Sequence, residues 1–157
     1  MDILTDRLIL HPITPVEAQR IIAQTPAAHD RWHPEYPLGD ELGPLRGLAV
    51  LTDPHPFFTL YAIQTFPEGL SIGGIGFFGP PDEEGRAELG YGLVESVRGS
   101  GLAAEALRAL TDAAFRTGAH IIEADTAVEN IASQRVLLNV GFREVRRTDD
   151  SVFFELR

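Results

Sequence analysis

The spacing of hydrophobic and polar positions along this chain predicts a sheet of about seven strands. Residues alternate with the two-residue period of a half-buried strand in seven stretches: 5–13, 57–64, 70–78, 86–94, 120–128, 142–147 and 151–156. Apolar residues recur at helical spacing in 103–116 and 130–140, and shorter helices are expected over 14–24 and within 40–51. The pattern indicates an α/β (α+β) fold in which helices flank a mixed, mainly antiparallel central sheet.

Residues with particular backbone preferences mark the ends of several of these elements. Thr14 is followed by Pro15 and then by Glu17, which is the pattern of a capped helix start. The turn at 66–69 contains Pro and Gly, so the strands on either side of it are expected to form a hairpin. Gly141 is expected to end the last helix. The strand after the long helix should run parallel to the strand before it.

A glycine-containing turn joins the strand at 86–94 to the long helix, with Gly99 and Gly101 in the turn itself. The first amides of a helix have no partner within it, and the helix dipole places partial positive charge there. A turn without bulky side chains therefore lets a pyrophosphate reach those amides. The simpler interpretation is that the two glycines only relieve a tight turn at positive φ.

Length and composition narrow the class of protein. A chain of 157 residues is expected to form one domain, spanning residues 1–157, with a sizeable core. Cysteine is absent, which excludes disulfides, a thiolate nucleophile and cysteine metal ligands. The five histidines are scattered without the spacing of metal ligands, so no metal is expected.

Charge and the amino terminus indicate the environment and partners. The formal net charge of -10 argues against nucleic acid and anionic membranes as partners, because both favour Lys and Arg. The amino terminus lacks a basic start and an apolar run, and no segment is long enough to span a bilayer. The cytoplasm is therefore the expected location, and a homodimer is left open.

A second motif overlaps the same glycines. The run from Gly99 to Ala104 also fits the dinucleotide fingerprint G-x-G-x-x-A. That fingerprint opens a domain that needs several more strand and helix units, and too little chain follows Gly99 to build them. The acidic residue expected about 20 positions later would be Glu123, which falls inside a predicted strand. Dinucleotide binding is therefore rejected.

Three stretches together resemble the GNAT superfamily of acyl-CoA N-acyltransferases. The pattern Arg98-x-x-Gly101-x-Ala103 resembles its pyrophosphate loop, and the run 129–142 resembles its second signature, an Asn-x-x-Ser/Ala followed by Gly-Phe. The opening at 5–14 resembles the RimJ/RimL-like branch, with a histidine in place of the usual arginine. The resemblance covers essentially the whole chain and implies a GNAT fold with splayed central strands.

The resemblance implies acetyl-CoA as co-substrate and assigns residues to bind it. The pyrophosphate would lie on the main chain of Arg98, Gly99, Ser100, Gly101, Leu102 and Ala103. The pantetheine arm would lie where the strand at 86–94 splays from its neighbour, bonding to the main chain of Leu93 and Val94. Asn130 and Ser133 would contact the same arm, although Asn130 is equally suited to capping its helix.

The reaction implied by the resemblance is direct attack of a neutral amine on the thioester of acetyl-CoA. A base must remove a proton from the ammonium, and an acid must protonate the leaving sulfur. Glu88 is the base that the resemblance suggests, and an exposed strand carboxylate is the alternative. Many relatives carry a tyrosine acid where this chain has Leu137, so Ser133 is the suggested acid, unless it only bonds back to its helix.

The acceptor is expected to be a primary amine, either a small cationic molecule such as an aminoglycoside-like antibiotic or a protein N-terminus. Trp32, His33 and Tyr36 lie in a long polar loop and are candidates for the acceptor site, unless they only pin that loop to the core. The acidic charge leans toward a small molecule. A non-catalytic acyl-CoA sensor is the alternative from another class, and a housekeeping role is not distinguished from a resistance role.

Overall fold

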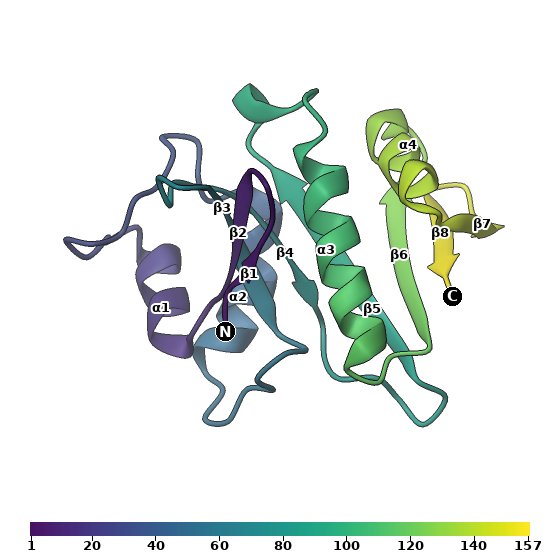
Figure 1. The fold of residues 1–157 in the computed structure, drawn as a ribbon, viewed down its shortest axis with the longest axis horizontal. Helices are drawn as coiled ribbons and strands as arrows, with labels where there is room; N and C mark the ends of the chain where they lie inside the picture. Colours follow the sequence, from purple (N-terminus) through teal and green to yellow (C-terminus); the bar gives the residue numbers. More distant parts are fainter.

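A computed structural model describes residues 1–157, and its centre is a sheet of eight strands (Figure 1). The strands are β1 (Ile3–Leu4), β2 (Leu8–Pro12), β3 (Leu60–Thr65), β4 (Ser71–Phe77), β5 (Arg86–Leu93), β6 (Ile121–Ala127), β7 (Arg143–Arg147) and β8 (Ser151–Leu156). Their order is β1-β2-β3-β4-β5-β6-β8-β7, and only β5 and β6 are parallel. The predicted mixed sheet is confirmed. The strand beyond the predicted seven is β1, whose two residues are too few to show a period.

Four helices cover the two faces of the sheet. They are α1 (Pro15–Ala23), α2 (Leu42–Ala49), α3 (Leu102–Arg116) and α4 (Ile131–Val140). Helices α1 and α2 pack together, whereas α3 packs over β2, β4 and β5 and beside α4. Figure 1 shows α3 in front of the sheet and α2 behind it. Two short 3-10 turns, η1 (Gly39–Glu41) and η2 (Glu95–Val97), precede α2 and follow β5. No helix is long and apolar enough to cross a bilayer.

The caps predicted from the sequence are present. The Thr14 side chain accepts a hydrogen bond from the Glu17 amide at 3.1 Å, and the Glu17 side chain accepts one from the Thr14 amide at 2.8 Å. At the start of α4 the Asn130 side chain accepts from the Ser133 amide at 3.1 Å. Gly141 ends α4 with φ of 113°. These local bonds satisfy main-chain groups that the helices leave unpaired.

The two faces of β5 differ in chemistry. Ala87, Leu89 and Leu93 are buried in the cluster of 30 residues that forms the hydrophobic core. Glu88, Gly90 and Gly92 point to the opposite face, because side chains alternate along a strand. On that face Gly92 has no side chain, and a Cβ there would lie 2.7 Å from Leu38, just before η1. The η1–α2 segment therefore lies close to a bare stretch of the sheet.

Strands β5 and β6 pair over only a short distance and then part. Their register covers Arg86–Glu88 and Ile121–Glu123. The Val94 amide donates to the Ile72 carbonyl at 2.8 Å, so even-numbered residues of β5 bond to β4. The main-chain groups of odd-numbered residues therefore face β6, where no strand lies beside Leu93. The predicted splay of the central strands is confirmed.

Candidate active site

The turn before α3 presents a row of free amides. Gly99 and Gly101 adopt φ of 92° and 83°, which favours glycine at both positions, and Gly101 is the N-cap of α3. The amides from Gly99 to Ala103 donate to no group of the protein, whereas the Arg98 amide donates to the Glu95 carbonyl at 3.2 Å. Five successive amides, including those of Ser100 and Leu102, are thus available to an anion at the positive end of a helix dipole.

The amino-terminal residues brace this turn. The Thr5 hydroxyl and the Arg7 amide donate to Oε2 of Glu105 at 2.5 and 2.9 Å. Nη1 of Arg7 donates to the Ser100 carbonyl at 2.9 Å. Burial would raise the pKa of Glu105, but the hydrogen bonds from Thr5 and Arg7 outweigh it and lower that pKa. The carboxylate therefore stays ionised and anchored, and the turn is held from outside the helix.

The main chain at the end of β5 borders the opening between β5 and β6. Nε of Arg98 donates to the Leu93 carbonyl at 2.9 Å, while the Leu93 amide faces the opening. Val94 is fully buried, and its amide is occupied by the Ile72 carbonyl. The structure therefore places Leu93 at the opening and Val94 within the sheet, although both were predicted to bind the pantetheine arm.

A tyrosine that the sequence analysis did not single out spans the opening. Oη of Tyr91 lies 2.7 Å from Oγ of Ser133 and donates to the Ser133 carbonyl at 3.2 Å. Burial raises the pKa of Tyr91, and the hydrogen bond with Ser133 offsets this in part. Leu137, where many relatives carry tyrosine, is fully buried in the core. Position 137 thus offers no hydroxyl, but Tyr91 of β5 places one next to Ser133.

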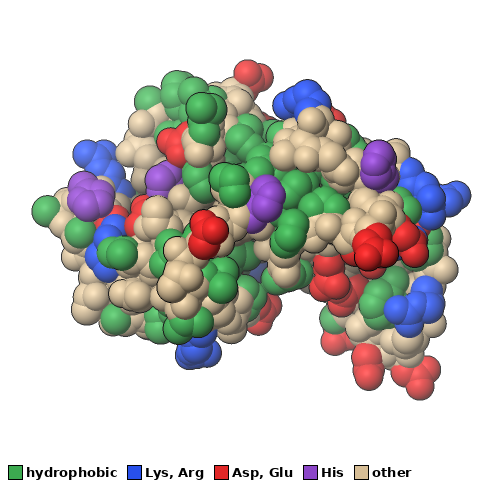
Figure 2. All heavy atoms as spheres, turned by 90° about the horizontal axis from the view of Figure 1, so that it is seen from below, with side chains coloured by type: hydrophobic (Ala, Val, Ile, Leu, Met, Phe, Trp, Pro, Cys, Tyr) green, Lys and Arg blue, Asp and Glu red, His purple; other side chains and the backbone are tan.

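Glu88 lies at the place where β5 and β6 begin to part. It is exposed and lines a hollow of about 350 Å³ together with Glu123 and Asp125. Burial raises the pKa of Glu88, and the negative charges of Asp125 and Glu123 add to this effect. Acidic side chains gather on this half of the molecule, beside a notch in its surface (Figure 2). Four residues, about 13 Å of extended strand, separate Glu88 from Gly92.

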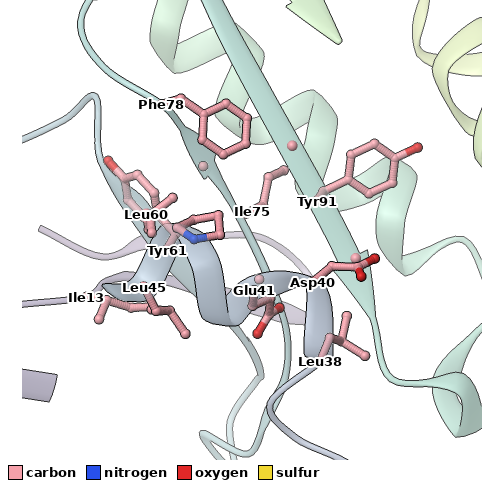
Figure 3. A pocket seen from close by; sticks show the side chains of 15 residues that line it. Ile13, Leu38, Asp40, Glu41, Leu45, Leu60, Tyr61, Ile75, Phe78 and Tyr91 are labelled. Carbon is pink, nitrogen blue, oxygen red and sulfur yellow. The ribbon is translucent and has the colours of Figure 1, made fainter. Parts of the chain in front are cut away.

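A cavity of about 210 Å³ lies between the η1–α2 segment and the sheet (Figure 3). Its floor is formed by glycines of β4 and β5, and most of its walls are apolar. Asp40 and Glu41 are its charged residues, and no Arg or His side chain lines it. Phe78 lines it and is 54% exposed, so the cavity reaches the surface. It lies on the face of the sheet opposite α3 and can hold a small cation.

The three aromatic residues predicted for the acceptor site lie outside the cavity above the glycines. Trp32 forms a bridge with Ser71, and the His33 amide donates to the Ser71 carbonyl at 3.0 Å. Tyr36 is buried, with its ring 6.1 Å from that of Trp32. Trp32 lines a separate hollow with His11. All three residues connect the long loop to the start of β4, and none lines the cavity above the glycines.

A splayed sheet beside a turn with five free amides is the arrangement that the resemblance to acyl-CoA N-acyltransferases implies. The family model described as an acetyltransferase (GNAT) domain matches residues 7–143. The chain therefore belongs to the GNAT family of acetyltransferases, which take the acetyl group from acetyl-CoA. No cluster of three or more His, Asp or Glu is arranged to hold a metal ion.

Individual relatives agree with this assignment. Over 72 residues the chain is 38% identical to the uncharacterized N-acetyltransferase YjdG of Bacillus subtilis (strain 168), which covers 45% of this chain and 43% of that protein. The matched region is thus less than half of the relative. An acetyltransferase from Agrobacterium tumefaciens str. C58 has a TM-score of 0.70 at 24% identity, covering 100% and 94% of the two chains. Mycobacterium smegmatis RimJ in complex with CoA-disulfide has a TM-score of 0.65 at 23% identity, covering 95% and 81%.

Proposed function

We propose that this protein transfers the acetyl group of acetyl-CoA to a primary amine, on a small cationic molecule or a protein N-terminus, when both substrates are bound. The row of free amides from Gly99 to Ala103, next to the opening beside Leu93, is the observation that carries the proposal. A diphosphate accepts hydrogen bonds from such amides. An extended arm attached to it then runs along β5 in place of a neighbouring strand.

The residues around the opening have distinct roles in this proposal. The Leu93 amide bonds to the pantetheine arm, while Arg98 and Val94 hold the end of β5 in shape. Asn130 caps α4 and so keeps Ser133 at the opposite side of the opening. These groups position the thioester before any proton moves.

Two protons must leave the amine, and the sulfur must gain one. Acetyl-CoA supplies the acetyl group as a thioester. The ordinary pKa of tyrosine already lies well above neutrality and burial raises that of Tyr91 further, so its hydroxyl carries a proton at pH 7. We assign Tyr91, paired with Ser133, as the proton donor to the sulfur. Glu88 remains the base predicted from the sequence, and Glu88→Gln tests that prediction by its effect on turnover.

Calorimetry with CoA tests the amide row. Ser100 is exposed, and its substitutions to Asp and Asn have nearly the same shape but differ by one charge. A carboxylate beside the five amides should repel a diphosphate, so Ser100→Asp should bind CoA at least tenfold more weakly than Ser100→Asn. Equal affinities for the two variants would contradict the placement of the diphosphate.

Release of free thiol from acetyl-CoA in the presence of an amine panel tests transfer itself. The chain contains no lysine, so its own amino terminus is the sole amine that self-acetylation could modify, and mass spectrometry detects this directly. Turnover that depends on the added amine supports the proposal. Tight CoA binding without thiol release for any amine would instead support an acyl-CoA sensor.

A further inference from the structure

One carboxylate oxygen in the cavity above the glycines lacks a hydrogen-bond partner. Oε1 of Glu41 is buried and accepts no hydrogen bond, a state that it shares in this protein only with Oη of Tyr36. Tyr36 lies in the core, whereas Glu41 lines a cavity that reaches the surface. A buried carboxylate oxygen without a partner costs folding free energy, so its retention beside a cavity points to a ligand.

The carboxylate of Glu41 lies directly over one glycine pair of the sheet. Gly74 of β4 faces Gly92 of β5, and a Cβ at Gly74 would collide with Oε1 of Glu41. The residue after Gly92 is Leu93, whose amide borders the opening assigned to the thioester. Successive strand residues are about 3.3 Å apart. Glu41 is therefore much closer to the reacting carbonyl than Glu88, which is four residues further along β5.

The remaining lining of the cavity limits what can lie beside Glu41. Figure 3 shows Glu41 between Leu45 and Leu38, with Asp40 as the second acid. The volume of about 210 Å³ is below the roughly 300–1,000 Å³ typical of sites for drug-sized ligands. Apolar walls offer no partners to the hydroxyls of a large polyhydroxylated cation. The cavity fits one positive group on a compact apolar body.

We infer that Glu41 binds the ammonium group of a compact primary amine with an apolar body and accepts its proton before the amine attacks the thioester. This inference rests on the proposed acetyl transfer. Burial raises the pKa of Glu41 to about 7, the charge of Asp40 adds to the increase, and the main chain of Leu38 opposes it. A carboxylate with a pKa near neutrality is suited to general-base catalysis at neutral pH.

The protons and electrons of the step balance. The ammonium gives one proton to the carboxylate of Glu41, and the freed lone pair of the nitrogen forms the bond to the carbonyl carbon. The bond from that carbon to sulfur then breaks, and the sulfur keeps the electron pair. The nitrogen loses its second proton to solvent as the amide forms. The sulfur takes up a proton from the Tyr91 and Ser133 pair, and solvent returns a proton to that pair. Glu41 returns its proton to solvent.

Steady-state thiol release with four amines tests the inference. The panel contains benzylamine and pentylamine as compact apolar amines, kanamycin as a polyhydroxylated cation, and a tetrapeptide with a free serine terminus. We expect kcat/KM for benzylamine to exceed that for kanamycin and the peptide by at least about 100-fold. Glu41→Gln should lower kcat/KM for benzylamine by about 100-fold or more, the scale of a lost general base, and Glu41→Asp should restore part of it.

A matched charge control and a pH profile separate catalysis from structure. Glu83→Gln removes the same charge from an exposed turn and should leave kcat/KM within about twofold of wild type. The wild-type kcat/KM should rise with pH through an apparent pKa near 7, and Glu41→Gln should lose that rise. Calorimetry should show that Glu41→Gln binds CoA with the same affinity as wild type.

Each outcome has one meaning. Glu41→Gln with near wild-type turnover and an unchanged pH profile overturns the role of Glu41 while leaving acetyl transfer in place. Preferred turnover of kanamycin or the peptide overturns the substrate class. A wild-type protein that releases no thiol with any amine overturns the proposed function and this inference together.

Discussion

Nε of Arg7 lies 2.7 Å from Oε1 of Glu105 and so connects the start of β2 to the first turn of α3. The same arginine donates from its amide to the other carboxylate oxygen and from Nη1 to the Ser100 carbonyl, each at 2.9 Å. Hydrogen bonds between charged groups at two points fix geometry as well as distance. The turn before α3 is therefore positioned by a residue 93 positions earlier in the chain than Ser100.

Arg7→Ala should weaken CoA binding without abolishing folding. Loss of the bonds to Glu105 and Ser100 lets the turn move, and we expect the Kd for CoA to rise about tenfold, equivalent to about 1.4 kcal/mol. The control is Arg31→Ala, which removes a single bond to the Glu68 carbonyl at 3.3 Å. Calorimetry measures the Kd for CoA of both variants and of wild type, at a temperature where all three proteins are fully folded. An unchanged Kd for Arg7→Ala would contradict a bracing role.

Stability should fall with rising pH because of His11. The hydrogen bond to Glu17 raises the pKa of His11 to about 9, burial opposes the increase, and Asp2 adds to it. The folded state therefore holds a proton that the unfolded chain loses above about 6.5, so this stabilisation is complete below that pH and is lost through about 9.

The matching experiment is urea unfolding of His11→Gln and wild type between pH 6 and 10. His11 is 31% exposed, so after allowance for screening we expect a difference of about 1–2 kcal/mol at pH 6 that is mostly gone at pH 10. Parallel stability curves for the two proteins would rule out a protonated His11. The result would also explain how a histidine replaces the arginine usual at this position.

Glu41→Gln should be more stable than wild type at high pH. The pKa of Glu41 is raised from its usual 4.5 to about 7 by burial, so the folded state resists ionisation. Ionised Glu41 therefore destabilises the folded state. This loss of stability begins above the pKa of about 4.5 of the unfolded chain, grows as the pH approaches 7, and is complete once the pH is well above 7. We expect Glu41→Gln to gain about 1–2 kcal/mol at pH 8 and almost nothing at pH 5. Thermal melts at both pH values measure this, and a loss of stability at pH 8 would indicate a structural role.

Tyr91→Phe should slow turnover while leaving CoA affinity unchanged. The substitution removes the hydroxyl beside Ser133 but keeps the ring, and we expect kcat to fall by about 10- to 100-fold. Tyr36→Phe is a matched control, because it removes a buried hydroxyl that has no hydrogen-bond partner and lines neither the opening nor the cavity above the glycines. Single-turnover thiol release reports the step. Equal rates for the two variants would remove Tyr91 from the chemistry.

Much of the fold followed from the sequence because it is encoded locally. Strand alternation, the capping pair Thr14 and Glu17, and the helix stop at Gly141 each depend on residues within a few positions of one another. The glycine turn was also visible, because its two signals, a strand before and a helix after, are adjacent to it. These features need no knowledge of what lies beside them in space.

The cavity above the glycines could not be predicted because its parts are distant in sequence. Glu41 resembles any acid in a polar loop until Gly74, on another strand, brings it over the sheet. In the sequence Tyr91 is an ordinary strand residue. Its hydroxyl can reach Ser133 only because β6 diverges from β5 after Glu88, and this divergence is not visible in the sequence. The aromatic residues Trp32 and Tyr36 drew attention by type alone, and the structure uses them to pack the loop.

The bare floor of the cavity gives the enzyme a simple route to altered selectivity. An added methyl group at Gly76 would meet main-chain atoms at 2.6 Å, which cannot yield. At Gly90 the nearest atom, at 3.0 Å, belongs to the ring of Phe78, which is half exposed and free to rotate aside. The substitution Gly90→Ala can therefore narrow the cavity by one carbon atom while the sheet beneath remains intact.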